Sequence, residues 1–174
     1  MTDEAKPTPA RTRRGCLRFL VVLLALAGAL FILGRMFVVQ RIRVPEDMTC
    51  MSPALTPGAP AWVDKLSLRI TAPRRGDMVA VAAPSKPLGV DILRVVALPG
   101  EAVAAKDGTL VVDGAPVAES YARGELPGSF AAQRVPRGHY FVLPDDRGAY
   151  GARSLPRKPV SRQEIIGRVL PASR

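Results

Sequence analysis

Beyond Val44 the sequence consists of short apolar runs separated by glycine and proline, and no long run has the apolar spacing of a helix. Residues 78–82 form one run that stops before Pro84, and residues 92–98 form another that stops at Pro99. Proline lacks a backbone donor and ends regular pairing of this kind. Short apolar runs bounded by turn residues are typical of β-strands. The sequence therefore predicts a mainly β domain of the barrel or folded-sheet type.

The clearest turn signal is Lys106-Asp107-Gly108, which lies between the runs 102–105 and 109–112. An Asp-Gly pair between two apolar runs is a strong indication of a β-hairpin. Asp113-Gly114 predicts a second turn directly afterwards, and residues 122–129 are expected to form a loop. Further strands are expected over residues 61–64, 140–143 and 165–170.

Residues 19–33 are continuously apolar or small, and the apolar segment extends with interruptions to Val39. A membrane-spanning helix needs about 20 such residues. A cleaved signal peptide is the alternative, but no clear small-residue cleavage pattern follows Leu33. We therefore expect a disordered basic tail over residues 1–17, a retained transmembrane helix over 18–39 and an extracytoplasmic β domain over 40–174. Basic residues are more frequent before the span than after it, which favours a cytoplasmic N-terminus.

The formal net charge of +10 suits contact with an anionic membrane surface or with nucleic acid. No zinc spacing, helix-turn-helix pattern or aromatic RNA-binding strand is present, so a nucleic-acid partner is not expected. The chain has one histidine, His139, and no cluster with metal-ligand spacing, so neither a metal nor another cofactor is expected. Cys16 and Cys50 flank opposite ends of the apolar segment, which makes a disulfide between them implausible if that segment spans a bilayer.

The run Cys50-Met51-Ser52-Pro53-Ala54-Leu55 begins a few residues after the apolar segment. Its proline excludes a regular helix or a central strand, so the run predicts a rigid turn that presents its first residues at a surface. The alternative is a proline-rich connector between an anchor and a domain. The rest of the chain decides between these interpretations.

Three blocks of residues occur in a recognisable order: residues 50–55, residues 75–79 with 91–101, and residues 138–147 with 165–169. This order resembles the type I signal peptidase family (peptidase S26), the membrane-anchored serine/lysine proteases that remove signal peptides. The resemblance covers residues 44–170 and the preceding anchor. It implies a signal-peptidase-like folded sheet, a bacterial cytoplasmic membrane location, and signal peptides or preproteins as partners.

The resemblance implies a serine nucleophile at position 50 and a lysine general base at position 93. Here these positions hold Cys50 and Leu93. A cysteine can act as a nucleophile, but a leucine neither accepts nor donates a proton. General acid–base help is worth about 10²–10⁴-fold in rate, so its loss should be severe. An apolar neighbour at position 93 should also keep Cys50 a neutral thiol.

The resemblance further implies that Met51, Pro53 and Leu55 shape an apolar cleft near the bilayer. Arg94, Asp145 and Arg147 match supporting positions of the site, and we expect Asp145 and Arg147 to form a structural ion pair. Arg153 is a further match, whereas the serine and second aspartate of the family have no clear equivalent. His139 is weighed as a partner for Cys50, although its position at a strand entrance favours a structural role.

These substitutions lead to three hypotheses. The favoured one is a non-catalytic signal peptidase homologue that binds signal peptides or export machinery, or modulates an active paralogue. The alternative is a working endopeptidase in which Cys50 is the nucleophile and the base is unrecognised. The third is a structural or interaction domain whose cleft has lost its role.

Overall fold

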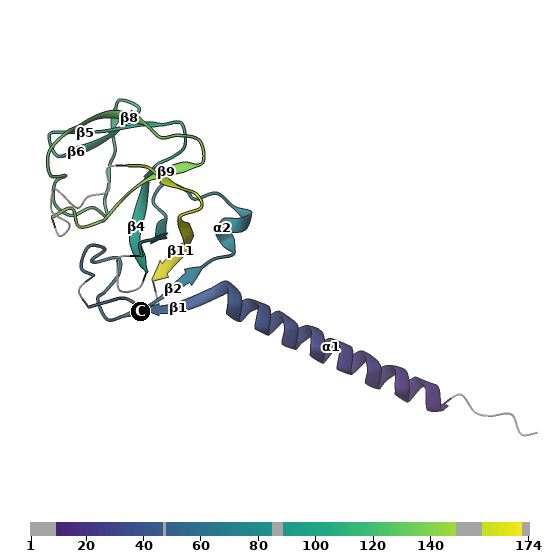
Figure 1. The fold of residues 1–174 in the computed structure, drawn as a ribbon. Coiled ribbons are helices and arrows are strands. Elements are labelled where there is room, and N and C mark those ends of the chain that lie inside the picture. Colours follow the sequence, from purple (N-terminus) through teal and green to yellow (C-terminus); the bar gives the residue numbers. More distant parts are fainter. Residues whose placement is uncertain (1–9, 47, 85–88, 149–157, 172–174) are drawn as a thin grey trace, which may run out of the picture. The chain divides into compact units, whose positions relative to one another are not determined.

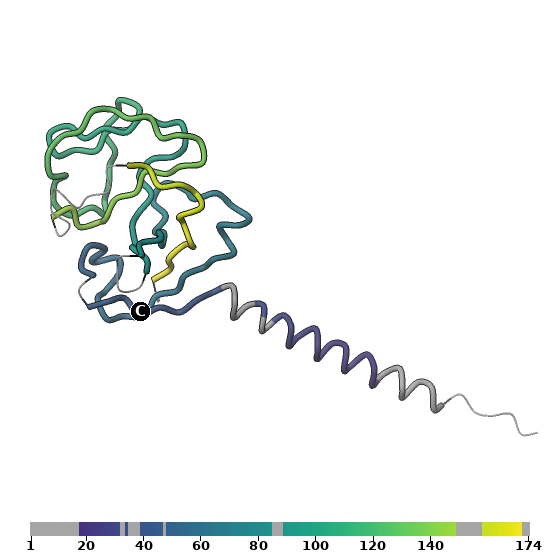
Figure 2. The backbone as a smooth tube through the Cα atoms, in the orientation of Figure 1, coloured from purple at the N-terminus to yellow at the C-terminus, as the bar shows by residue number. Residues whose placement is uncertain are grey.

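The computed structural model describes residues 10–46, 48–84, 89–148 and 158–171, and its backbone is traced in Figure 2. Contacts divide the chain into two units, Met1–Val38 and Val39–Arg174. The described part of the first unit is one helix, α1 (Ala10–Val38), which begins within the tail that the sequence predicts to be disordered. Among the described residues, no helix combines the length and the apolar character needed to cross a membrane. The transmembrane helix expected over residues 18–39 is therefore not confirmed.

The second unit is built from antiparallel strands in two sheets, as expected for a mainly β domain (Figure 1). The larger sheet has the order β1-β2-β11-β3-β4-β9-β10. Its strands are β1 (Val39–Arg43), β2 (Pro60–Asp64), β3 (Met78–Ala82), β4 (Val90–Ala97), β9 (His139–Leu143), β10 (Val160–Ser161) and β11 (Ile165–Pro171). The smaller sheet, β7-β6-β5-β8, comprises β7 (Ala115–Pro116), β6 (Thr109–Val112), β5 (Ala102–Lys106) and β8 (Phe130–Arg134). One short helix, α2 (Ser67–Ile70), follows β2.

The predicted hairpin is confirmed in the smaller sheet. Lys106 at the end of β5 pairs with Thr109 at the start of β6, which leaves Asp107 and Gly108 as a two-residue loop. Both loop residues have positive φ, 49° and 76°. Positive φ at both positions is the requirement of a type I′ turn, which explains why an Asp-Gly pair stands here.

Gly167 marks a close approach between β11 and β2. A Cβ atom at this position would lie 2.6 Å from Val63 Cγ1 and 2.8 Å from the carbonyl oxygen of Asp64. The pairing of β11 with β3 also shifts register between Ile165 and Gly167. A glycine in a strand commonly marks such a bulge or close contact, so the last strand can lie beside β2 only without a side chain here.

Three apolar clusters form the core of the second unit. One of them joins the smaller sheet to the end of β4 and to Phe141 and Leu143 of β9. The second, called the Cys50 cluster, contains Val44, Cys50, Met51, Leu55, Ala61, Val63, Ala80, Ile92 and Val169. The third, called the Leu93 cluster, contains Leu68, Val79, Val81, Leu93, Val95, Tyr140, Val142 and Ile165. Because neighbouring residues of a strand point to opposite faces, β4 contributes Ile92 to one cluster and Leu93 to the other.

Candidate functional site

The run around Cys50 forms a tight turn, as the sequence predicts. The amide of Leu55 donates to the carbonyl oxygen of Met51 at 2.9 Å, and that of Ser52 donates to Thr49 at 3.0 Å. The carbonyl oxygen of Cys50 accepts a hydrogen bond from the Asp146 amide at 2.8 Å. The turn is thus fixed both internally and by the segment that follows β9. Cys50 itself is only 7% exposed, so the turn holds its side chain in the core and not at the surface.

The three residues expected to line a cleft have different positions. Met51 and Leu55 are 0% and 2% exposed and belong to the Cys50 cluster. The expectation that they shape a cleft mouth is therefore wrong for this structure, because both side chains fill the core beneath the turn. Pro53 is exposed and lines a pocket.

Leu93 lies in the middle of β4, opposite Val79 of β3, and is 4% exposed. Its neighbours are aliphatic and aromatic side chains of the Leu93 cluster. Cys50 packs instead in the cluster that contains Ile92. The two positions at which the sequence resemblance predicts a nucleophile and a base therefore lie in separate apolar clusters. An aliphatic side chain packed in this way cannot take a proton from a thiol.

The structure does not bring His139 to Cys50. His139 is the first residue of β9, and its ring Nδ1 lies 3.1 Å from the Arg137 carbonyl oxygen. The Cys50 carbonyl oxygen accepts a backbone hydrogen bond from Asp146, which lies beyond the opposite end of that strand. A five-residue strand spans about 13 Å at about 3.3 Å per residue. His139 is thus a strand-end residue, and a Cys50–His139 pair is not formed.

Arg94 and Asp145 form a bidentate ion pair beside the Cys50 turn. Arg94 Nε donates to Asp145 Oδ1 at 2.7 Å, and Nη2 donates to Oδ2 at 2.5 Å. The expected pair between Asp145 and Arg147 is therefore wrong. Arg94 lies opposite Leu143 on the adjacent strand and so reaches the carboxylate that follows β9. Arg147, which is 1% exposed, pairs instead with Glu119 at 2.6 Å.

Two residues of this network, Glu119 and Tyr121, were not found by sequence reasoning. The Tyr121 hydroxyl donates to Glu119 Oε1 at 2.9 Å, and the Arg94 guanidinium lies 4.3 Å from the centre of the Tyr121 ring. Burial and the adjacent Glu119 carboxylate raise the pKa of Tyr121 well above its usual value. Glu119 is 28 residues from Arg147 in the sequence, and no local motif predicts a contact over that separation.

We expect Tyr121 to remain protonated in the folded protein at pH values where free tyrosine ionises. Its raised pKa means that its contribution to stability is present below about pH 10 and is lost as the pH rises further, because the unfolded chain ionises first. Tyrosinate absorbance and far-UV circular dichroism, followed together from pH 9 upward, test this. The difference titration between the protein and Tyr121→Phe should show no ionisation of Tyr121 before unfolding. A normal titration with pKa near 10 in the folded state would contradict the expectation.

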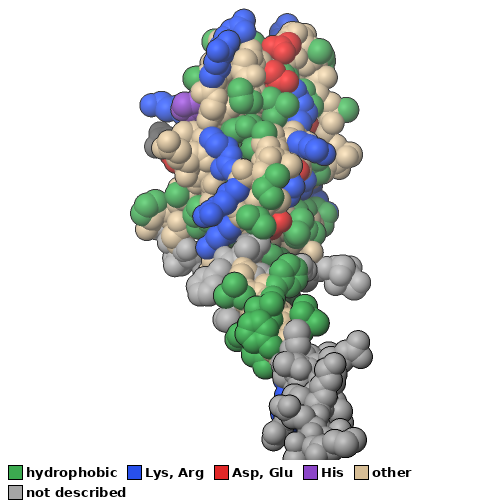
Figure 3. All heavy atoms as spheres, turned by 90° about the vertical axis from the view of Figure 1, so that its right-hand side faces the viewer, with side chains coloured by type: hydrophobic (Ala, Val, Ile, Leu, Met, Phe, Trp, Pro, Cys, Tyr) green, Lys and Arg blue, Asp and Glu red, His purple; other side chains and the backbone are tan. Residues whose placement is uncertain are grey.

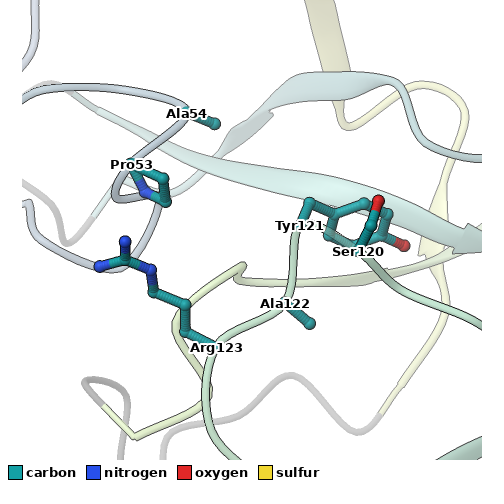
Figure 4. Close-up of a pocket in the computed structure, with 6 residues that line it drawn as sticks. All are labelled: Pro53, Ala54, Ser120, Tyr121, Ala122 and Arg123. Atoms are coloured by element: carbon teal, nitrogen blue, oxygen red, sulfur yellow. The ribbon is translucent and has the colours of Figure 1, made fainter.

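A pocket opens between the Cys50 turn and the segment before Gly124 (Figure 4). Its volume is about 290 Å³, and Pro53, Ala54, Ser120, Tyr121, Ala122 and Arg123 line it. Figure 4 shows the Arg123 side chain extending from its segment toward Pro53. The sequence predicts a loop that begins at Ala122, but it indicates neither an element for Ser120 and Tyr121 nor a role for this segment. Arg153, a predicted match, lies outside the described residues.

Comparison with known proteins identifies the family of this mainly β chain. The family model for signal peptidase, peptidase S26, matches residues 16–172. The chain therefore belongs to the signal peptidase family.

Individual proteins similar to this chain are also signal peptidases. The chain is 32% identical to a probable signal peptidase I-1 of Synechocystis sp., over 100% of this chain and 91% of the relative. It is 30% identical to a signal peptidase I of Bacillus licheniformis, over 84% and 81% of the two chains. A crystal structure of a signal peptidase I from Enterococcus faecalis is similar with a TM-score of 0.43 and 25% identity, covering 56% of this chain and 97% of that one.

Proposed function

We propose that this protein is a signal peptidase homologue that has lost peptidase chemistry and binds the signal peptides of preproteins. The observation that carries the proposal is Leu93. The resemblance assigns a lysine base to this position, and here an aliphatic side chain, 4% exposed, occupies it within an apolar cluster. Without a proton acceptor and donor, neither attack by Cys50 nor departure of the amine is assisted.

What supports retained binding is the framework around the site. The Cys50 turn keeps its hydrogen bonds, and the Arg94–Asp145 pair remains bidentate. A domain that had lost every role of this region would have little need of a buried charged network, because such networks cost desolvation free energy. Binding of export machinery or of an active paralogue is the other form of this proposal.

We further propose that the domain works at the outer face of the bacterial cytoplasmic membrane, with the N-terminus in the cytoplasm. Support comes from the distribution of charge. Figure 3 shows many Lys and Arg side chains and few acidic ones on the face in view, in line with a net charge of +10. Basic surfaces are attracted to anionic headgroups by about 1 kcal/mol for each residue near the membrane.

The test uses the full chain in detergent micelles and a preprotein peptide with a photo-crosslinker in its signal sequence. We expect saturable crosslinking that an unlabelled signal peptide competes away, and no cleavage after prolonged incubation. A thiol-directed probe should leave Cys50 unlabelled in the folded protein, because its side chain is buried, and should label it after denaturation. Mass-spectrometric mapping separates labelling at Cys50 from labelling at Cys16.

The outcomes distinguish the hypotheses. Cleavage that is lost in Cys50→Ala would overturn the proposal and establish an endopeptidase with a cysteine nucleophile. Absence of both cleavage and specific crosslinking would leave a structural or interaction domain without a peptide site. Crosslinking without cleavage supports the proposal.

A further inference from the structure

The pocket of Figure 4 is lined by neither Cys50 nor Leu93, so it plays no part in the peptide-bond chemistry discussed for those two positions. Pro53 and Ala54 form one wall, and they follow Cys50 by three and four residues. Ser120, Tyr121, Ala122 and Arg123 form the other. We propose that this pocket binds a single carboxylate of the bound peptide, which pairs with the Arg123 guanidinium. The inference rests on the proposed function, since it assumes that a peptide binds beside the Cys50 turn.

Both walls of the pocket are fixed to the same short segment. The Asp146 amide donates to the carbonyl oxygen of Cys50 at 2.8 Å, which holds the first wall. The Arg123 amide donates to the Asp145 carbonyl oxygen at 2.7 Å, and the Arg147 amide donates to that of Arg123 at 2.9 Å, which holds the second. The pocket therefore keeps a fixed distance from Cys50. Preorganised walls lower the cost of ordering the site when a ligand binds.

Tyr121 adds rigidity to the second wall. Its ring lies against the Arg94 guanidinium at 4.3 Å, and its hydroxyl is bonded to Glu119. Glu119 is itself held by Arg147. The carboxylate of Glu119 is thus already neutralised by a buried cation, and it is not among the residues that line the pocket.

The charge of the pocket comes from Arg123. This side chain is exposed, and its guanidinium forms no hydrogen bond or ion pair with any described residue, whereas those of Arg94 and Arg147 are both paired with carboxylates. Guanidinium stays protonated at all relevant pH values and recognises carboxylates with paired hydrogen bonds. The Ser120 hydroxyl on the same wall can donate to a second carboxylate oxygen.

Size and charge select one carboxylate. A volume of about 290 Å³ lies just below the range of about 300–1,000 Å³ that is usual for small-molecule and cofactor sites. It suits one amino-acid side chain or one chain end. A phosphate group carries nearly two charges and is usually held by several cationic or backbone donors. The carboxylate can belong to an Asp or Glu side chain of the peptide or to its free C-terminus, and the experiment separates these sources.

The test measures fluorescence anisotropy of labelled peptides with the full chain in detergent micelles. One peptide series spans the signal sequence and the residues after it, with Glu or Gln placed at each position in turn and an amidated C-terminus. A second pair of peptides ends directly after the small residues that mark the cleavage site of a signal sequence. One peptide of this pair has a free C-terminal carboxylate, and the other has an amidated C-terminus. We expect at least one acidic form to bind about two- to fivefold more tightly than its neutral match, the range of a partly exposed ion pair.

Substitutions then assign the effect to the pocket. In Arg123→Gln the acidic and neutral peptides should bind equally, and in Arg123→Glu a lysine at the selected position should be preferred. The matched control is Arg137→Gln, an exposed arginine before β9 that does not line the pocket. It should keep the preference for the acidic form. A preference found in the Glu series identifies a side chain, and one found in the second pair identifies a chain end.

A second measurement does not depend on peptide binding. N-acetylated, amidated glutamate is titrated into the labelled protein while the Nε–Hε signals of arginine are followed by NMR. The Arg123 signal is the one that is absent from the spectrum of Arg123→Gln. We expect this signal to shift as glutamate is added and the signal assigned to Arg137 to remain at its position. Peptide binding without an acid preference, or with a preference that Arg123→Gln retains, would overturn the pocket assignment alone. If no peptide binds, the proposed function fails, and the glutamate titration decides for or against the pocket.

Discussion

Asp145→Asn should lower the free energy of unfolding by about 3–5 kcal/mol, the usual cost of removing one partner of a buried ion pair. The Asp145 side chain is 0% exposed and accepts two hydrogen bonds from Arg94, whose side chain is 12% exposed. The asparagine amide offers the guanidinium at most one acceptor oxygen and no negative charge, so the bond to the Gly76 carbonyl oxygen and the contact with Tyr121 remain but the buried charge is no longer balanced. Chemical denaturation followed by circular dichroism measures the change.

Asp77→Asn is the matched control for this prediction. Asp77 also pairs with an arginine, Arg168 at 2.8 Å, but both side chains are about one-fifth exposed. Solvent screening limits such a pair to about 0–1 kcal/mol. The double variant Arg94→Met with Asp145→Asn should be less destabilised than the sum of its single changes, because no charge is left buried without its partner. A loss in Asp145→Asn within about 1 kcal/mol of the Asp77→Asn value would contradict the assigned role.

The strands that could be predicted from sequence are those in which buried apolar side chains predominate. β3 was expected with the bounds it has, and β4, β9 and β11 differ from expectation by at most two residues at an end. β1 and β8 were not expected as strands. Both lie at a sheet edge, and their side chains are largely exposed or only half-buried. Edge strands of this kind lack the apolar pattern on which sequence reasoning depends.

The candidate site likewise contains residues that could be predicted from sequence and residues that could not. Cys50, Leu93, Arg94, Asp145 and Arg147 could be proposed as site residues because each lies in a contiguous block of sequence that resembles the family. Their pairing was predicted wrongly, because an ion pair depends on which residues face each other across strands. Arg94 on β4 pairs with Asp145, which directly follows the neighbouring strand β9. Arg147 pairs with Glu119, which belongs to another segment of the chain. Glu119, Tyr121 and Arg123 lie in a stretch without periodicity, so only the folded chain reveals them.

The burial of Met51 and Leu55 has a related cause. A motif identifies residues that a turn requires, but it does not say whether a side chain faces a ligand or the core. In this turn the alternating exposure of Met51, Pro53 and Leu55 shows that the proline faces the pocket while its apolar neighbours anchor the turn from below. Truncation of these anchors therefore changes stability first and any peptide binding only through the turn.

Introducing the serine and lysine that the sequence resemblance implies, by Cys50→Ser with Leu93→Lys, should not produce cleavage, and it should destabilise the fold. Leu93 is 4% exposed within the Leu93 cluster, so an ammonium there would lose its hydration. Burial lowers the pKa of a lysine by up to about 3–5 units, and a shift of 3 units corresponds to about 4 kcal/mol. Leu93→Met, which keeps size and polarity, is the control and should cost less than about 1.5 kcal/mol.

The pH dependence separates a buried lysine from a general packing defect. With a pKa lowered in the folded state, the unfolded chain binds more protons near neutrality, so the stability of the Leu93→Lys variants should rise as the pH increases from 7 toward 10. The Leu93→Met control should show no such gain. Activity should stay absent throughout this range, because residue 50 packs in the Cys50 cluster and the new side chain starts in the Leu93 cluster. Cleavage of a preprotein by the double variant would show instead that a lysine at position 93 reaches the turn, and that loss of the dyad alone separates this chain from an active peptidase.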